Sequence, residues 1–204
     1  MMLKNRARVC AGVVFSIAAM VCSNSALAAE QGANGAIEIS DSTFDCMRDM
    51  TKVDGFYVDN LLGDPTATVA VASSADGGVY PPGSVVQLVP GEVMVKHGEG
   101  FSPATKDWEF FELDVSAEGT AIRKRGFVDV VNRFGGNCFG CHIQAEPQWD
   151  MVCKTGRGCD PIPLSKEVLA VLQKTDPRCD NEPLSEQEMG LLKQLQQAMA
   201  PKPE

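Results

Sequence analysis

The fold is indicated most clearly by residues 82–97, which read PGSVVQLVPGEVMVKH. Two runs of β-branched and apolar residues lie on either side of Pro90-Gly91. Residues of this kind are enriched in strands, and a Pro-Gly pair is a turn signal. The stretch therefore predicts two neighbouring strands joined by a short turn.

The same pattern continues on both sides of this stretch. Turns rich in glycine and proline separate the runs and are too short to contain crossover helices, so the strands should be antiparallel. The predicted strands cover residues 66–73, 84–89, 92–97, 108–115 and 120–131. We therefore expect an antiparallel meander.

A short helix is expected before the strands, within residues 41–51. Phe44 and Met47 lie at helical spacing there, and Asp41 or Ser42 is placed to cap the helix.

Two further helices are expected near the C-terminus. Ser165 is placed to cap a helix over residues 166–175, and Ser185 to cap one over residues 186–199. Glu188 completes a capping box with Ser185. The expected fold class is α+β, with an antiparallel sheet between an N-terminal helix and a C-terminal helical hairpin.

The first 28 residues have the features of a secretory signal peptide. Three basic residues precede an apolar stretch over residues 9–22, and Ala26-Leu27-Ala28 matches a cleavage site. The alternative is an uncleaved membrane anchor, but the apolar stretch is short for a membrane span. We expect cleavage before Ala29, a flexible leader over residues 29–40 and export to a bacterial periplasm.

The composition is that of an ordinary globular protein. The chain has 204 residues, of which 44% are hydrophobic and 22% are charged, and its formal net charge is -9. An acidic surface repels phosphate backbones, so nucleic acids are not expected partners. No stretch beyond the predicted signal peptide is long and apolar enough to span a membrane.

The cysteine content points to an oxidising compartment. Of eight cysteines, two lie in the predicted signal peptide. Four of the others are candidates for two disulfides with three alternative pairings: Cys46, Cys153, Cys159 and Cys179. We favour Cys159–Cys179 with Cys46–Cys153, and a redox-active Cys153/Cys159 pair is the alternative.

The remaining two cysteines belong to a motif that carries chemistry, Cys138-Phe139-Gly140-Cys141-His142. C-x-x-C-H is the attachment sequence of a c-type haem. Two thiols three residues apart can form thioethers with the two vinyl groups of one porphyrin. The adjacent histidine then becomes an axial ligand of the iron. The motif predicts one covalently bound haem c.

The motif has three other interpretations. A thioredoxin-like pair would follow a strand in a βαβ unit, whereas this motif follows an antiparallel pattern. A zinc site would need further ligands, for which His97, Cys153 or Cys159 are available without a recognisable spacing. A structural disulfide between the two thiols is the last alternative.

Three segments in this order resemble the cytochrome P460 family, which includes the β-sheet cytochromes c′. They are PGSVV at residues 82–86, DWEFF at 107–111, and CFGCH at 138–142 followed by WDMV at 149–152. The resemblance covers residues 54–155. It implies an antiparallel β fold with one haem c, and a homodimer.

The family includes hydroxylamine-oxidising enzymes and proteins that bind nitric oxide. In the enzymes, a lysine a few residues after the glycine turn is covalently linked to the haem. Counted from Gly83, that place falls at Leu88, and the next lysine is Lys96. This departure makes the chain resemble the enzymes less than the binding proteins.

His142 is the expected proximal ligand of the haem iron. Histidine and methionine are known axial ligands, and phenylalanines would line an open apolar site. The candidates for the distal side are His97, Met94, Met151, Phe110 and Phe111. The alternative for His97 is a surface residue, and the alternative for the methionines and phenylalanines is a place in the core.

The sequence therefore leaves three hypotheses about function. The first is a periplasmic mono-haem cytochrome that binds a small diatomic ligand of the nitric oxide type or passes single electrons to a redox partner. The second is an enzyme that oxidises hydroxylamine or converts nitric oxide, and the third is a haem-free exported domain with disulfides or a zinc site. In the haem hypotheses, residues 41–158 form the haem c domain and residues 159–204 a Cys-linked helical hairpin.

Overall fold

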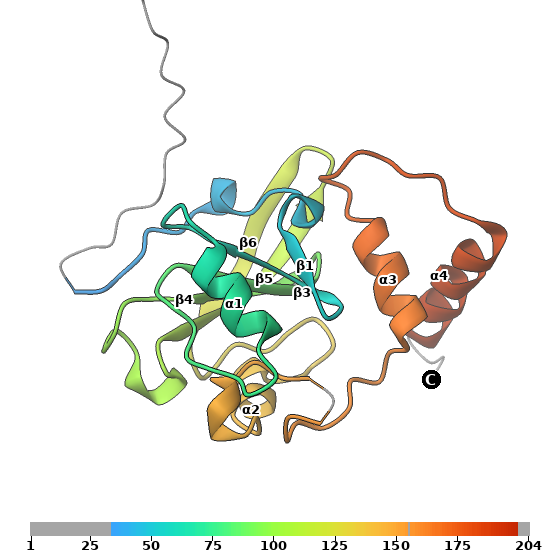
Figure 1. The fold of residues 1–204 in the computed structure, drawn as a ribbon. Coiled ribbons are helices and arrows are strands. Elements are labelled where there is room, and N and C mark those ends of the chain that lie inside the picture. The colour runs from blue at the N-terminus through green and yellow to red at the C-terminus, as the bar shows by residue number, and fades with distance from the viewer. Residues whose placement is uncertain (1–33, 155, 200–204) are drawn as a thin grey trace, which may run out of the picture.

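Six strands form one antiparallel sheet in which each strand pairs with the next one along the chain. The structure is a computed structural model that describes residues 34–154 and 156–199 (Figure 1). The strands are β1 Thr51–Val53, β2 Phe56–Asn60, β3 Ser84–Val89, β4 Glu92–Lys96, β5 Trp108–Ser116 and β6 Gly119–Gly126. The predicted antiparallel meander is confirmed. The predicted signal peptide, residues 1–28, lies outside the described residues.

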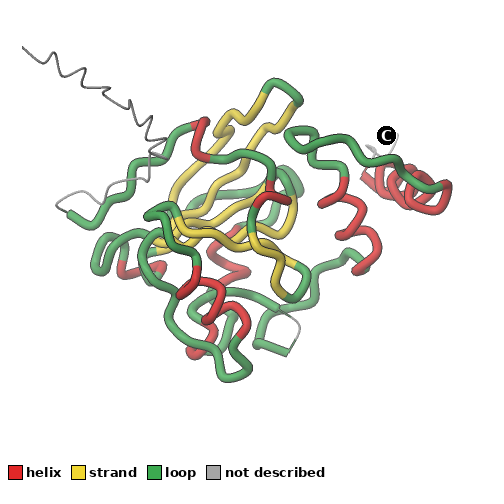
Figure 2. Tube along the Cα trace, turned by 45° about the horizontal axis from the view of Figure 1, so that its top comes forward, coloured by secondary structure: helices red, strands yellow, loops and turns green. Residues whose placement is uncertain are grey.

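Four α-helices in the described residues accompany the sheet, and Figure 2 shows the strands as a layer bordered by helices and long loops. They are α1 Thr66–Ser73, α2 Cys138–His142, α3 Lys166–Lys174 and α4 Glu186–Met199. The helical hairpin of α3 and α4 is present as predicted, with Ser165 accepting a hydrogen bond from Val168 N–H at 3.3 Å. No helix in the described residues is long and apolar enough to cross a membrane.

The prediction of a strand over residues 66–73 is wrong, because this segment is helix α1. Its two threonines and two valines are β-branched residues typical of strands, but its three alanines favour a helix. The buried side chains are those of Thr68 and Ala72, four residues apart on one helical face.

The predicted N-terminal helix is also wrong. Residues 41–51 hold two 3₁₀ turns, η1 Asp41–Thr43 and η2 Met47–Asp49, and the cap residue of the first is Ser40. Backbone donors here bond to distant side chains, since Met47 N–H donates to Asp176 Oδ2 at 3.0 Å. These tertiary bonds replace the ladder that a continuous helix would need.

The two faces of the sheet carry separate hydrophobic cores because successive side chains on a strand point to opposite faces. One face, here called the motif-side core, packs strand residues against α1, α2 and the loop after α2; its members include Val58, Val86, Met94, Trp108 and Phe110. The opposite face, here called the far-side core, packs strand residues against the N-terminal segment; its members include Phe44, Val93, Val95, Phe111 and Leu113.

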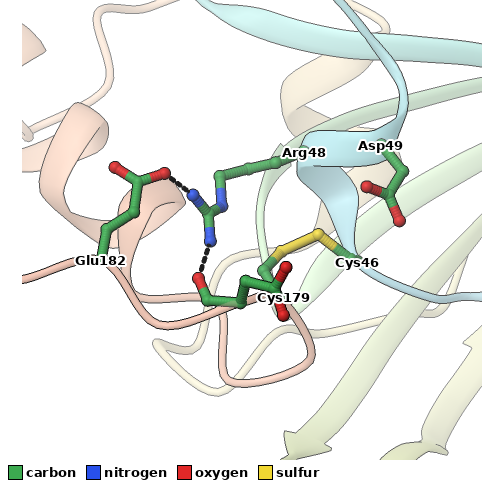
Figure 3. Close-up of a pocket in the computed structure, with 6 residues that line it drawn as sticks. Cys46, Arg48, Asp49, Cys179 and Glu182 are labelled. Carbon is green, nitrogen blue, oxygen red and sulfur yellow. Dashed lines mark hydrogen bonds and ion pairs between the residues drawn. A yellow bond between two sulfur atoms is a disulfide. The ribbon is translucent and has the colours of Figure 1, made fainter.

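The disulfides differ from the favoured pairing. Cys46 is bonded to Cys179, and Cys153 to Cys159. The first bond ties the loop between α3 and α4 to the N-terminal segment (Figure 3). The predicted pairing is wrong because the helical hairpin folds back beside η2. This fold brings Cys179 rather than Cys153 to Cys46.

Polar contacts reinforce this attachment of the helical hairpin. Arg48 bonds to the Glu182 carboxylate and the Asp180 carbonyl group beside the disulfide (Figure 3). Gln173 Nε2 donates to the carbonyl oxygens of Gly55 and Leu88 at 2.6 and 2.9 Å. The hairpin is thereby joined to the sheet through buried polar groups as well as the disulfide.

Replacing both Cys46 and Cys179 by alanine is expected to lower the free energy of unfolding by about 2–4 kcal/mol. The bond joins residues 133 positions apart, so its loss restores much chain entropy to the unfolded state. Removing Cys153–Cys159, which spans six positions, should cost less. Urea denaturation of the two double variants measures both losses, and equal losses would contradict this ordering.

Candidate functional site

The C-x-x-C-H motif forms the whole of helix α2, which lies on the motif-side core. Asn137 caps the helix, because its side-chain oxygen accepts a hydrogen bond from Gly140 N–H at 2.6 Å. The same side chain donates to the Val128 carbonyl group at 3.0 Å, and Cys138 N–H donates to the Val130 carbonyl group at 3.0 Å. These bonds fix α2 against the chain that leaves the sheet.

Both thiols of the motif are free in the described residues, whereas the other four described cysteines are paired. Cys138 is partly buried against the motif-side core, and Cys141 is exposed. Burial raises the pKa of Cys138 to about 11, with the Glu92 and Glu112 charges adding to the effect. Burial also raises the pKa of Cys141. A thioredoxin-like pair needs a lowered thiol pKa, so this geometry disfavours that alternative.

His142 is held in one tautomer by a backbone carbonyl group. Its Nδ1 atom lies 2.7 Å from the Met151 carbonyl oxygen, which can only accept, so Nδ1–H is the donor. The neutral imidazole then has its lone pair on Nε2, the atom suited to bind a metal. Burial lowers the pKa of His142, which favours the neutral ring.

The Met151 carbonyl group is placed by an unusual backbone turn. Asp150 and Met151 have φ angles of 48° and 67°, in the left-handed region that non-glycine residues rarely adopt. Such residues persist only where surrounding contacts hold them.

A buried ion pair supplies those contacts. Lys96 Nζ lies 3.0 and 2.8 Å from the two carboxylate oxygens of Asp150, and both side chains are buried. Asp150 Oδ2 also accepts from Tyr80 N–H at 2.9 Å, and the Asp150 carbonyl oxygen accepts from Trp108 Nε1–H at 2.8 Å. Lys96 and Asp150 therefore support the carbonyl group that orients His142. The only signal in the sequence was a lysine at the end of the apolar run VMVK.

The structure brings two of the distal candidates to this face. Phe110 lies beside the motif, with 5.2 Å between its ring centroid and that of His142. Met94 pairs with Phe110 across β4 and β5 and is buried in the same core. Met151 contributes its carbonyl group to His142.

The structure places the other two distal candidates, Phe111 and His97, away from the motif. Phe111 belongs to the far-side core. His97 is 1% exposed, its Nδ1 atom accepts from Ile37 N–H at 3.0 Å, and its Nε2 atom lies 2.8 Å from Glu109 Oε2. Because Glu109 neighbours Phe110 on β5, its side chain points to the opposite face. Both ring nitrogens of His97 are therefore engaged on the face of the sheet opposite the motif.

Within the described residues, the side chains considered as zinc ligands do not come together. Within residues 34–154 and 156–199, no group of three or more histidine, cysteine or acidic side chains is placed to hold a metal ion. Cys153 and Cys159, considered as zinc ligands, form a disulfide instead. Cys153 Sγ lies 3.5 Å from the Cys141 carbonyl oxygen, so this disulfide borders the motif.

Large apolar side chains are exposed in the segments next to the motif. Five lie between residues 128 and 162, with exposed fractions of 39–59%: Val128, Val131, Phe134, Ile143 and Ile162. These side chains lie close to the motif in the sequence.

Comparisons of this chain with protein-family models, curated proteins and solved structures found no match. The chemistry of the site is therefore the basis for inferring function. Two free thiols on one helix, an imidazole with an available Nε2 atom and adjacent apolar side chains could hold a flat, apolar, metal-containing group.

Proposed function

We propose that this protein is an exported mono-haem c-type cytochrome of the cytochrome P460 type. Cys138 and Cys141 hold one haem covalently, and His142 is the axial ligand of its iron. The observation that carries the proposal is that only the two thiols of the C-x-x-C-H motif remain free among the described cysteines. Its activity is the binding of a small diatomic ligand or the transfer of single electrons.

The donor set fits this cofactor. Each thiol adds its S–H across one vinyl double bond to give a thioether, which needs a free cysteine. The neutral imidazole of His142 offers Nε2, and its Nδ1–H bond to the Met151 carbonyl group is the partner that a metal-bound histidine requires. Haem supplies a redox-active iron that can also bind diatomic gases.

The resemblance to the P460 family is supported by contacts between the segments that carry it. Trp108, in the segment DWEFF, donates its indole N–H to the Asp150 carbonyl group, in the segment WDMV. Lys96 joins the same two residues, because its ammonium group also lies 5.1 Å from the Trp108 ring centroid. A six-stranded antiparallel sheet agrees with the fold that the resemblance implies.

Ligand binding or electron transfer is favoured over hydroxylamine oxidation by the lysine positions. Leu88 occupies the place of the haem-linked lysine and packs against the motif-side core. The next lysine, Lys96, is buried with its ammonium group on Asp150. Neither position offers a free amine for a lysine–haem bond.

The absorption spectrum of the dithionite-reduced protein, with and without carbon monoxide, tests the activity. The protein should be exported in a host that attaches haem c. A shift on adding carbon monoxide indicates an open or weakly held iron site and ligand binding. A sharp spectrum that carbon monoxide leaves unchanged indicates a second protein ligand and an electron carrier, and a colourless protein contradicts both.

Replacing His97 by alanine is expected to leave this spectrum unchanged. His97 lies in the far-side region, where its ring bonds to Ile37 N–H and the Glu109 carboxylate. The loss of these bonds should instead lower the free energy of unfolding by about 1–3 kcal/mol. Spectra of the reduced variant, alongside urea denaturation, separate the two effects, and a changed iron spin state would show that His97 does reach the haem.

A further inference from the structure

Two buried polar atoms without a hydrogen-bond partner lie close to the Arg157 side chain. The Tyr80 hydroxyl group and Trp149 Nε1 are buried, and neither has a hydrogen-bond partner in the described residues. The Arg157 guanidinium group lies 4.0 Å from the Trp149 ring centroid, and Arg157 is only 6% exposed. No acidic side chain within residues 34–154 and 156–199 forms an ion pair with Arg157. We call these residues the Tyr80–Trp149–Arg157 cluster.

The chemistry of this cluster selects a negatively charged acceptor. The indole N–H and the guanidinium group can only donate, and the tyrosine hydroxyl group can donate as well. Burial raises the pKa of Tyr80 to about 12, so its proton stays in place at neutral pH. Leaving buried donors without partners is unfavourable by about 1–3 kcal/mol each. A carboxylate would satisfy several of them at once through charge-assisted bonds.

The position of the cluster relative to the motif identifies the source of that carboxylate. Glu112, Phe110 and Trp108 succeed one another on one face of β5, at every second residue. The segment before α2 lies at Glu112, because Arg133 N–H donates to Glu112 Oε1 at 3.2 Å and Cys138 N–H donates to the Val130 carbonyl group at 3.0 Å. The His142 ring lies beside Phe110.

At the other end of this row, the Tyr80 ring centroid is 5.4 Å from that of Trp108. Along about 13 Å of β5, the order of groups is therefore the Cys138 thiol, the His142 imidazole and the Tyr80–Trp149–Arg157 cluster. Haem has the same order of groups, with vinyl groups on one edge, the iron in the middle and two propionate carboxylates on the opposite edge.

We propose that the Tyr80–Trp149–Arg157 cluster binds a propionate carboxylate of the haem. This inference rests on the proposed function, and it assigns these residues a role in holding and tuning the cofactor. The negative charge of a propionate favours the ferric state of the iron. Because Arg157 compensates this charge, it favours the ferrous state and raises the reduction potential. Tyr80 and Trp149 donate the remaining hydrogen bonds.

The reduction potential of the haem-loaded protein tests this assignment. Arg157→Gln should shift the one-electron oxidation equilibrium about tenfold toward the ferric state, which lowers the potential by about 59 mV. The potential should also become pH-dependent near neutrality, because a propionate without its cation binds a proton more readily. Arg157→Lys should keep most of the wild-type potential, and Tyr80→Phe should shift it in the same direction as Arg157→Gln but less.

Arg125→Gln is the matched control. Arg125 also stacks over an aromatic ring, but it is more exposed than Arg157 and bonds to Glu109 beside the far-side core. Its replacement should change the oxidation equilibrium less than twofold. If Arg157→Gln behaves like this control in both potential and pH dependence, the propionate assignment is wrong.

A free carboxylate is the other source of the same chemistry. Acetate, compared with chloride at equal ionic strength, should not raise the unfolding temperature of the haem-loaded protein, because the site is already filled. A rise in the wild type that Arg157→Gln abolishes would overturn the propionate assignment in favour of a free ligand. Absence of haem from the wild-type protein would overturn the proposed function together with this inference, so the two failures are distinguishable by mass.

Discussion

Replacing Cys138 and Cys141 together by serine should abolish covalent haem attachment. Serine hydroxyl groups do not form thioethers with vinyl groups, so neither anchor would remain. The mass of the denatured protein should fall by one haem relative to the wild type. Each single variant should retain one thioether and therefore keep some haem, at a reduced yield.

The neighbouring disulfide offers a matched control for this experiment. Replacing Cys153 and Cys159 by alanine also removes two cysteines next to α2, but it leaves the motif thiols in place. This variant should still carry covalent haem. Haem that stays bound to the Cys138→Ser/Cys141→Ser variant after denaturation would refute the assigned anchors.

Replacing Lys96 by methionine is expected to lower the free energy of unfolding by about 3–5 kcal/mol. The substitution leaves the Asp150 carboxylate buried without its cation, which is far more unfavourable than losing an exposed ion pair. A second change, Asp150→Asn, removes that charge. Asparagine is also suited to the left-handed backbone conformation at this position. Urea denaturation of the single and double variants should show part of the stability regained in the double variant.

The same substitution should also change the bond between His142 and the iron. Lys96 supports the turn that presents the Met151 carbonyl group to His142 Nδ1–H. Weakening this hydrogen bond makes the imidazole a poorer donor to the metal. The iron–histidine stretching frequency of the reduced protein, measured by resonance Raman spectroscopy, should therefore fall in Lys96→Met.

A buried ion pair elsewhere in the fold controls for general destabilisation. Arg178 and Asp176 are 2.7 Å apart and almost completely buried in the loop between α3 and α4. Asp176→Asn should destabilise the protein without moving the iron–histidine frequency. If it moves the frequency as much as Lys96→Met does, Lys96 has no specific role in positioning His142.

The parts of the fold that could be predicted are those encoded by local pattern. Valine-rich runs around a Pro-Gly turn predict the strands β3 and β4, and the capping residues Ser165 and Ser185 predict the start of α3 and α4. Helix α1 does not follow from local pattern, because half of its residues are β-branched and burial of one helical face decides its conformation. β1 and β2 were missed because they are short and carry lysine and aspartate among their apolar residues.

The candidate site also contains residues that local pattern predicts and residues that only long-range contacts bring together. The motif residues follow from their spacing alone, whereas the pairing of Lys96 with Asp150 joins residues 54 positions apart. Tyr80 and Arg157 are farther apart still, and neither stands out in the sequence. His97 was attractive as the only other histidine, but the alternation of β5 shows that its partner Glu109 faces away from the motif. Long-range contacts of this kind, like the Cys46–Cys179 bond, depend on topology rather than spacing.

The most direct test is the mass of the wild-type protein, exported in a host that attaches haem c and measured after denaturation. The account predicts the mass of the chain from Ala29 onward plus one haem, with the haem retained in denaturant. The chain mass alone, or that mass less two hydrogens from a Cys138–Cys141 disulfide, would contradict it.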